Sequence, residues 1–115
     1  MDIGTDQVGE VIVLAREMVE QFAGADEQFD ALVGNMDEDE QADLLALLWI
    51  GRGDFEPEEW DEARRTALEE RTLPVAEYLK GVDHLAEHLE AGLEAMGFSA
   101  RDAEDDAVGP EPPRR

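Results

Sequence analysis

The residues best suited to catalysis in this 115-residue sequence are two histidines and the glutamate between them. His84, Glu87 and His88 match the pattern H-x-x-E-H, in which two histidines one helical turn apart bind zinc and the glutamate acts as a base. Such enzymes also need a third protein ligand and a large substrate cleft, which a short helical chain with few residues after the motif does not offer. We therefore interpret both histidines as residues at the edge of a core-facing helix that bind metal at most incidentally. We expect no cofactor and no catalytic residue.

A second candidate site surrounds Arg52, which stands between two glycines in the sequence G-R-G. A guanidinium held on such a corner could bind a phosphate or a carboxylate, with Trp49 and Trp60 as the walls of a small anion site. The simpler interpretation is that Arg52 offsets the negative end of a helix dipole and pairs with a nearby acid such as Asp54. We favour the simpler interpretation in so acidic a chain, and the anion site stays open as the alternative.

Two further arginines, Arg64 and Arg71, are expected on the helix face that carries Trp60. Their heads could contribute to the same anion site. Their long stems can also cover apolar surface while the heads pair with acids on a neighbouring helix, which is the commoner arrangement.

The charge of the chain excludes several classes of partner. Asp and Glu number 31 against 9 Lys and Arg, so the formal net charge is −22. This charge repels phosphate backbones and anionic membranes, so we expect no direct binding of nucleic acid or of a membrane. The absence of cysteine excludes disulfides and thiol catalysis. A basic protein surface is the expected partner, and the chain itself is expected to be a monomer or a weak homodimer.

Nothing in the sequence predicts export or membrane insertion. The first residues contain no basic region followed by an apolar stretch. The longest apolar run, Leu44 to Ile50, is far shorter than the roughly 20 residues that span a bilayer. We expect a soluble cytoplasmic protein.

The elements that must position these residues are helices. The longest apolar run lies in a predicted helix from Asp37 to Arg52, where Asp37 and Glu40 form a carboxylate capping box and Gly51 and Gly53 end the helix. This helix is apolar on almost every side, which predicts that it is buried at the centre of the fold.

Helical periodicity predicts the other elements around this central helix. A helix from Thr5 to Phe22 comes first, and Asp83 is expected to cap the helix that carries both histidines. On that last helix, Gly92 lies in the middle of the apolar face, where a missing side chain lets another backbone approach closely. The fold class is therefore an all-α, compact single-domain bundle of five to six short helices. It occupies residues 1–98, and residues 99–115 are expected to be a disordered, acidic, proline-rich tail.

The central helix also carries a family resemblance. Its sequence D-E-D-E-Q-A-D-L-L-A-L-L-W-I-G-R-G-D, followed by E-W-D-E-A at 59–63 and A-x-Y-L-x-G at 76–81, resembles a small, mainly proteobacterial family known as domain of unknown function 3775. The resemblance implies a shared fold over most of residues 5–97 and implies no reaction, ligand or partner. The chain departs from the family pattern at His84 and His88 and in its acidity.

These observations favour an acidic cytoplasmic interaction or regulatory module that is not an enzyme. Two alternatives stay open. The first is a nucleic-acid mimic, whose carboxylates occupy a basic DNA- or RNA-binding protein. The second is a small anion-binding protein or enzyme that uses Arg52, Trp49 and Trp60.

Overall fold

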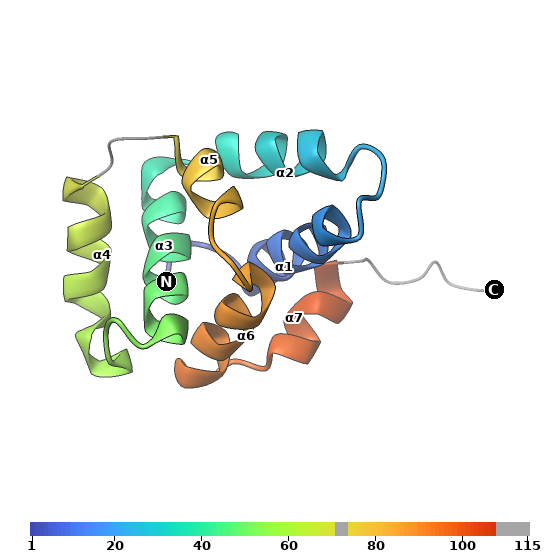
Figure 1. Cartoon of the computed structure of the whole chain (residues 1–115). Helices are drawn as coiled ribbons and strands as arrows, with labels where there is room; N and C mark the ends of the chain where they lie inside the picture. Colours follow the sequence, from blue (N-terminus) through green and yellow to red (C-terminus); the bar gives the residue numbers. More distant parts are fainter. Residues whose placement is uncertain (71–73, 108–115) are drawn as a thin grey trace.

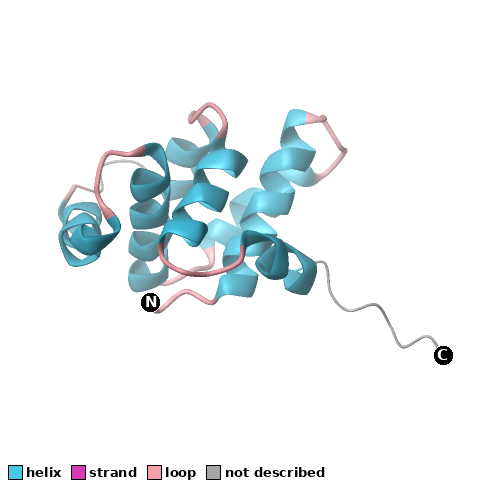
Figure 2. Cartoon of the chain, turned by 90° about the horizontal axis from the view of Figure 1, so that it is seen from below, coloured by secondary structure: helices cyan, strands magenta, loops and turns pink. Residues whose placement is uncertain are grey.

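The computed structural model describes residues 1–70 and 74–107, and these residues form helices joined by short loops (Figure 1). The described residues contain no strand (Figure 2), so the all-α single domain predicted from the sequence is confirmed. The elements are α1 (Thr5–Val19), α2 (Ala25–Gly34), α3 (Glu38–Arg52), the 3-10 helix η1 (Pro57–Glu59), α4 (Trp60–Glu69), α5 (Val75–Lys80), α6 (Leu85–Ala95) and α7 (Ala100–Ala107). None of these helices is long and apolar enough to cross a membrane.

Helix α3 lies at the centre, as predicted. The Asp37 carboxylate accepts a hydrogen bond from the Glu40 N–H at 2.8 Å, and the Glu40 carboxylate accepts one from the Asp37 N–H at 3.0 Å. This capping box satisfies two donors at the start of the helix. Along the rest of α3 the apolar side chains are buried except for Trp49, which is partly buried, and the helix packs between α4 and α6 (Figure 1).

The contact between α3 and α6 depends on two glycines. A Cβ atom on Gly92 of α6 would lie 2.2 Å from the Leu47 carbonyl oxygen of α3. A Cβ atom on Gly51 of α3 would lie 1.8 Å from the His88 carbonyl oxygen of α6. The two backbones therefore touch at both glycines, which confirms the close approach predicted at Gly92.

Gly51 consequently has a different role from the one expected. It lies inside α3 and packs against α6, whereas only Gly53, with φ +91°, ends the helix. The Asp54 N–H donates to the Trp49 carbonyl at 2.8 Å, which closes the last turn.

The first helix is shorter than predicted. It ends at Val19, and the side chains of Val19 and Phe22 are 83% and 54% exposed, although the periodicity placed both on the buried face. Leu14, off that face in the sequence pattern, is buried instead because α1 is covered from more than one side.

The expectation of a disordered tail from residue 99 is wrong for residues 100–107, which form α7; residues 108–115 lie outside the described part of the chain. The Ser99 hydroxyl accepts a hydrogen bond from the Asp102 N–H and so supports the first turn. Ala100 and Ala103 then pack on α1, where a Cβ atom on Gly9 would lie 2.1 Å from the Ala103 carbonyl oxygen. Alanines that bury little area each give a weak periodic signal, which is why the sequence pattern missed this helix.

One arginine joins three helices at this end of the molecule. Arg16 of α1 donates to Glu104 of α7 at 2.6 Å and to Glu90 of α6. Burial and a hydrogen bond with Glu90 raise the pKa of Glu104, although Arg16 lowers it. For Glu90, burial raises the pKa, but hydrogen bonds with Glu104 and Arg16 outweigh it and the net shift is downward. Glu104 is therefore the carboxyl of this pair that holds a proton more readily.

Because the backbones of α3 and α6 touch at the glycines, we predict that one added methyl group at this contact strongly destabilises the fold. Gly92→Ala forces the two backbones apart and is expected to lower the free energy of unfolding by about 2–3 kcal/mol or more. The control is Gly34→Ala at the end of α2, where a Cβ atom would meet nothing within 4 Å; this change is expected to be neutral or to stabilise by up to about 1 kcal/mol. Urea denaturation measures both, and equal effects of the two substitutions would contradict the close contact.

The Glu104 carboxyl predicts a pH-dependent difference. A carboxyl whose pKa is raised by folding adds stability at acid pH, where it is protonated, and that contribution is lost as the pH rises through its folded pKa. Glu104→Gln keeps the neutral form at every pH. The variant should therefore match the wild type in stability near pH 3 and gain on it as the pH rises towards about 7. Thermal melts across this range measure the difference, and a constant offset between the two proteins would count against the assignment.

Candidate functional site

Arg52 lies at the C-terminal end of α3 and pairs with Asp54. Its Nε and Nη2 atoms both approach Oδ2 of Asp54, at 2.9 Å and 2.8 Å. Burial lowers the pKa of Arg52, but the hydrogen bond to Asp54 and the proximity of Tyr78 more than offset it, and the pKa is raised. On one side, the Arg52 guanidinium pairs with Asp54 at the end of the helix, as the simpler interpretation predicted. On the other side, it faces Tyr78.

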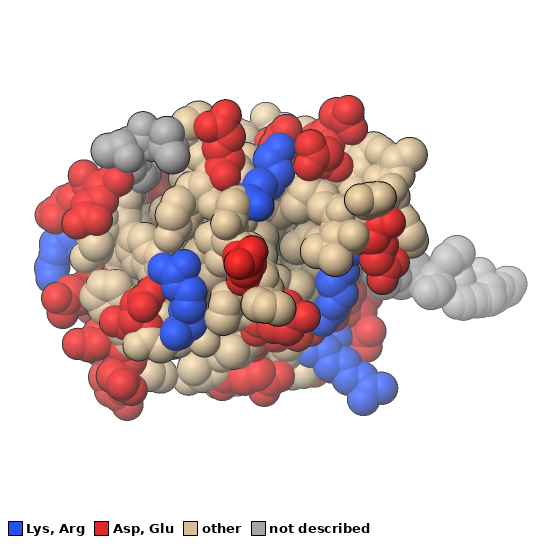
Figure 3. Space-filling view, viewed as in Figure 1, with Lys and Arg blue, Asp and Glu red and all other residues tan. Residues whose placement is uncertain are grey.

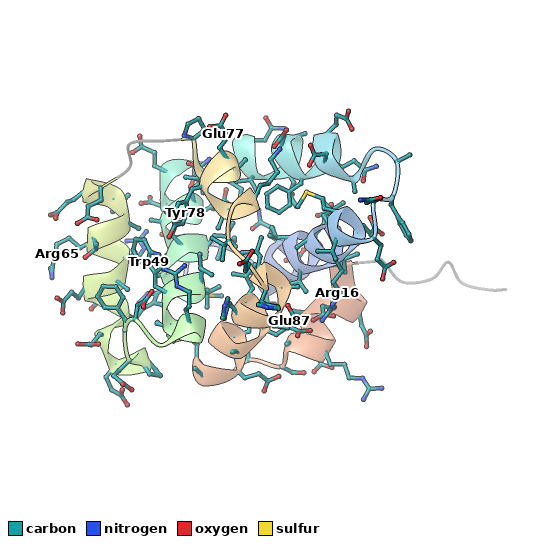
Figure 4. The ribbon with its side chains drawn as sticks, viewed as in Figure 1. Arg16, Trp49, Arg65, Glu77, Tyr78 and Glu87 are labelled. Atoms are coloured by element: carbon teal, nitrogen blue, oxygen red, sulfur yellow. The ribbon has the colours of Figure 1, made fainter. Side chains whose placement is uncertain are left out.

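Tyr78 links α5 to the end of α3. Its hydroxyl accepts a hydrogen bond from the Trp49 indole N–H at 3.1 Å, and Figure 4 shows the two side chains pointing toward each other. Trp49 also contacts the Phe55 ring, with ring centroids 5.9 Å apart. Trp49 is thus held between Tyr78 and Phe55.

These residues border an open pocket of about 600 Å³ between the end of α3, α5 and the start of α6. We name it the Tyr78 pocket, and it is lined by Arg52, Glu77, Tyr78, Gly81, Val82, Asp83, His84 and His88. Two candidate sites that were considered separately in the sequence, Arg52 and the histidine pair, therefore meet in one place. Trp49 touches this pocket through the Tyr78 hydroxyl.

The two histidines occupy the first turn of α6. His84 is the N-cap residue with φ +59° and no capping hydrogen bond from its side chain, so Asp83 is not the cap that the sequence predicted. The His88 N–H donates to the His84 carbonyl at 3.0 Å, which starts the helix. Within the described residues, no group of three or more His, Cys, Asp or Glu side chains could hold a metal ion.

Arg64 lies elsewhere, in an ion-pair network on the opposite side of α3. Its Nε atom donates to Asp43 at 2.5 Å, and its Nη2 atom lies 2.7 Å from Asp2 and 3.0 Å from Asp39. The hydrogen bond to Asp43 is the main cause of the raised pKa of Arg64, and burial opposes it. Pairing between helices, the commoner arrangement, is what the structure shows for Arg64.

Asp43 is the residue that the sequence pattern missed. It is fully buried inside the leucine run of α3, and it also accepts hydrogen bonds from the backbone N–H groups of Asp2 and Ile3. The carboxylate thereby fixes the N-terminal segment and α4 to α3. An acid on the side of a helix that is otherwise apolar was the available signal, because such a group needs a partner when it is buried.

The other residues of the expected anion site do not join Arg52. Trp60 begins α4 and packs against the core outside the Tyr78 pocket. Arg71 lies outside the described residues. Arg65 of α4 is exposed, points away from the molecule in Figure 4, and has no ion-pair partner among the described residues.

A second hollow, of about 640 Å³, lies between α1 and the α5–α6 segment. We name it the acidic groove. Its apolar lining residues are Ala15, Met18, Val19, Leu79, Val82, Leu85 and Ala86, and its charged and imidazole residues are Arg16, Glu20, Asp26, Lys80, Asp83, His84 and Glu87.

Both cations of the acidic groove already have acidic partners. Arg16 pairs with Glu90 and Glu104, and Lys80 lies 2.8 Å from Asp30 and 3.5 Å from Asp26. Hydrogen bonding to Asp30 is the main cause of the raised pKa of Lys80. In contrast, the Glu20, Asp83 and Glu87 carboxylates have no ion-pair partner in the described part of the chain. The groove therefore presents an apolar floor and uncompensated negative charge.

The described residues form an acidic, all-helical, single-domain protein. The chain belongs to the family described as Protein of unknown function (DUF3775), whose model matches residues 26–98, more than half of the chain. The match includes the whole Tyr78 pocket, whereas α1 and α7 lie outside it. No curated protein and no solved structure matches the chain.

The buried position of Asp43 predicts its importance for stability. Asp43→Asn removes the charge that Arg64 and two backbone N–H groups share, and we expect a loss of about 2–4 kcal/mol in the free energy of unfolding. The control is Asp39→Asn. Asp39 also pairs with Arg64, but the Asp39 side chain is 60% exposed, so this change should lower the free energy of unfolding by less than about 1 kcal/mol. Denaturant unfolding of both variants measures the difference. Comparable losses in the two variants would show that the burial of Asp43 does not determine how much it contributes to stability.

Proposed function

We propose that this protein is a cytoplasmic docking module that binds a basic amphipathic segment of a partner protein in the acidic groove and acts by binding rather than by catalysis. The observation that carries the proposal is the composition of that groove. An apolar floor is bordered by Glu20, Asp83 and Glu87, while both neighbouring cations are neutralised by other carboxylates.

Three features of the groove support this occupant. A helix with one apolar and one basic face can place its apolar side chains on Met18, Val19 and Val82 while its basic side chains reach the carboxylates at the edge. Val19 is 83% exposed without such a cover, so its side chain is accessible to an apolar group of a partner at the edge of the groove. Figure 4 shows Glu87 of α6 beside Arg16 of α1, at the border between the two walls.

The charge of the whole molecule adds long-range attraction. On the face shown in Figure 3, acidic side chains lie mainly along the edges and outnumber the basic ones. With a net charge of −22, this field accelerates association with a basic partner and weakens as salt is added. The groove supplies the specificity that charge alone lacks.

Nucleic-acid mimicry is the competing use of the same charge. Mimicry depends on carboxylates spread over the surface and needs no apolar floor. It therefore predicts that every exposed acid contributes alike, whereas docking in the groove predicts that Glu20 and Glu87 dominate.

The test uses a synthetic amphipathic peptide of about 18 leucine and lysine residues, five turns of helix, as the probe. Glu20→Lys with Glu87→Lys should weaken binding at least tenfold, whereas Glu58→Lys with Glu62→Lys, the same charge change at η1 and α4, should weaken it less than threefold. Isothermal titration calorimetry at a fixed salt concentration measures both. Equal weakening by the two pairs of substitutions would show that the peptide binds through general charge attraction, and it would contradict docking in the acidic groove.

A further change separates apolar contact from charge within the same assay. Val19→Asp adds negative charge, so a purely electrostatic interaction would become tighter. Docking on the apolar floor predicts weaker binding instead. The control is Leu68→Asp on α4, an exposed apolar residue outside the groove, which should leave binding unchanged or slightly tighter.

A further inference from the structure

The Tyr78 pocket gathers an unusual share of the hydrogen-bonding side chains of this chain. Both histidines and the single tyrosine of the sequence line it, together with Arg52. They come from three helices, α3, α5 and α6, so the grouping is a product of the fold and not of one amphipathic stretch. This open hollow of about 600 Å³ has room for a small molecule, and a few polar side chains converge on it.

The Tyr78 hydroxyl is placed to donate into this pocket. A tyrosine hydroxyl has one proton to donate and two lone pairs that accept. The hydrogen bond from the Trp49 indole N–H uses one of these lone pairs. Among the described residues the hydroxyl proton has no acceptor. The Tyr78 hydroxyl can therefore donate a hydrogen bond to an oxygen atom of a ligand in the pocket.

Arg52 presents a second donor group beside it. Its Nε and Nη2 atoms share one oxygen of Asp54, and Nη1 has no partner in the described part of the chain. The raised pKa of Arg52 keeps it positively charged. A guanidinium nitrogen and a hydroxyl that face one pocket suit a carboxylate.

Two acids restrict which carboxylate can bind. Glu77 and Asp83 also line the pocket, neither has an ion-pair partner among the described residues, and the chain as a whole carries −22 charges. A simple anion would meet repulsion from the rim and from the whole molecule. A ligand that carries a positive group as well as its carboxylate has no net charge and can pair with the rim.

We propose that the Tyr78 pocket binds a free α-amino acid, with its carboxylate on Arg52 and Tyr78 and its ammonium group on Asp83. The Tyr78 ring and Val82 form the apolar wall of the pocket, so an amino acid with an apolar side chain fits best. His84 and His88 supply further hydrogen-bonding nitrogen atoms at the start of α6. This site adjoins the acidic groove and shares Val82, Asp83 and His84 with it, but amino-acid binding here does not depend on docking in the groove.

The indole N–H of Trp49 reports on ligand binding because it donates to the Tyr78 hydroxyl. Trp60→Phe assigns the two indole signals in a ¹H–¹⁵N spectrum. L-Leucine, L-valine and L-phenylalanine are then titrated at constant ionic strength. At least one should give a saturable shift of the Trp49 signal, and the proposal fails if none does.

Ligand analogues test the two charged contacts separately. 4-Methylpentanoate lacks the ammonium group of leucine, and 3-methylbutylamine lacks its carboxylate. Each should bind at least tenfold more weakly than leucine. If 4-methylpentanoate binds as well as leucine, the pocket is a simple anion site and the proposal is wrong.

Variants assign the contacts to residues. Asp83→Asn should weaken leucine at least tenfold and strengthen 4-methylpentanoate, because it removes the ammonium partner and the repulsion together. Tyr78→Phe, which keeps the ring, should weaken the binding of both ligands, and dispersed amide signals confirm that the variant folds.

Arg65→Gln is the matched control for Arg52→Gln, since Arg65 lies outside the pocket. Arg65→Gln should leave leucine binding unchanged, whereas Arg52→Gln should weaken it at least tenfold. Equal effects of Arg65→Gln and Arg52→Gln would overturn the assignment.

Discussion

The rest of the structure depends on the backbone contact between α3 and α6. Gly51 and Gly92 each lie against a carbonyl oxygen of the other helix, and neither position has room for a Cβ atom. This contact sets more than the core packing. Arg52 follows Gly51 directly, and the carbonyl that Gly51 touches belongs to His88. Bringing the two backbones together therefore places the guanidinium of α3 and the histidines of α6 around one pocket, which Tyr78 then closes from α5.

Three of the cations hold helices together. Arg64 joins α4 and the N-terminal segment to the buried Asp43, Arg16 joins α1 to α6 and α7, and Lys80 joins α5 to α2. In a chain with this acid excess each cation has several possible partners, and removal of one beside a buried carboxylate is the most destabilising because it leaves a buried charge unpaired. The remaining carboxylates stay uncompensated at the surface, and there they shape both proposed binding sites. In the two proposals they provide the selectivity, by attraction of a basic segment to the acidic groove and by repulsion of simple anions from the Tyr78 pocket.

Much of the helical framework follows from the sequence. Periodicity and capping residues predicted α3 as the central helix, its capping box at Asp37, and the close approach at Gly92, and the structure confirms all three. Helix α7 was not predicted because its buried residues are alanines, which give little apolar contrast. Gly51 was mistaken for a helix end because a glycine that stops a helix and a glycine that admits a neighbouring backbone look the same in one dimension.

The sequence by itself determined the helical fold class, the central position of α3 and the acidity of the surface, because periodicity, capping and charge are properties of short stretches and of composition. Only the tertiary structure decided which side chains share a site. It separated Arg52 from Trp60 and Arg64, placed it with Tyr78, His84 and His88, and buried Asp43 where Arg64 and the N-terminal backbone could reach it. These groupings depend on which helices cross and how closely they approach. That is decided by contacts between residues far apart in the chain, such as the 88 positions between Arg16 and Glu104.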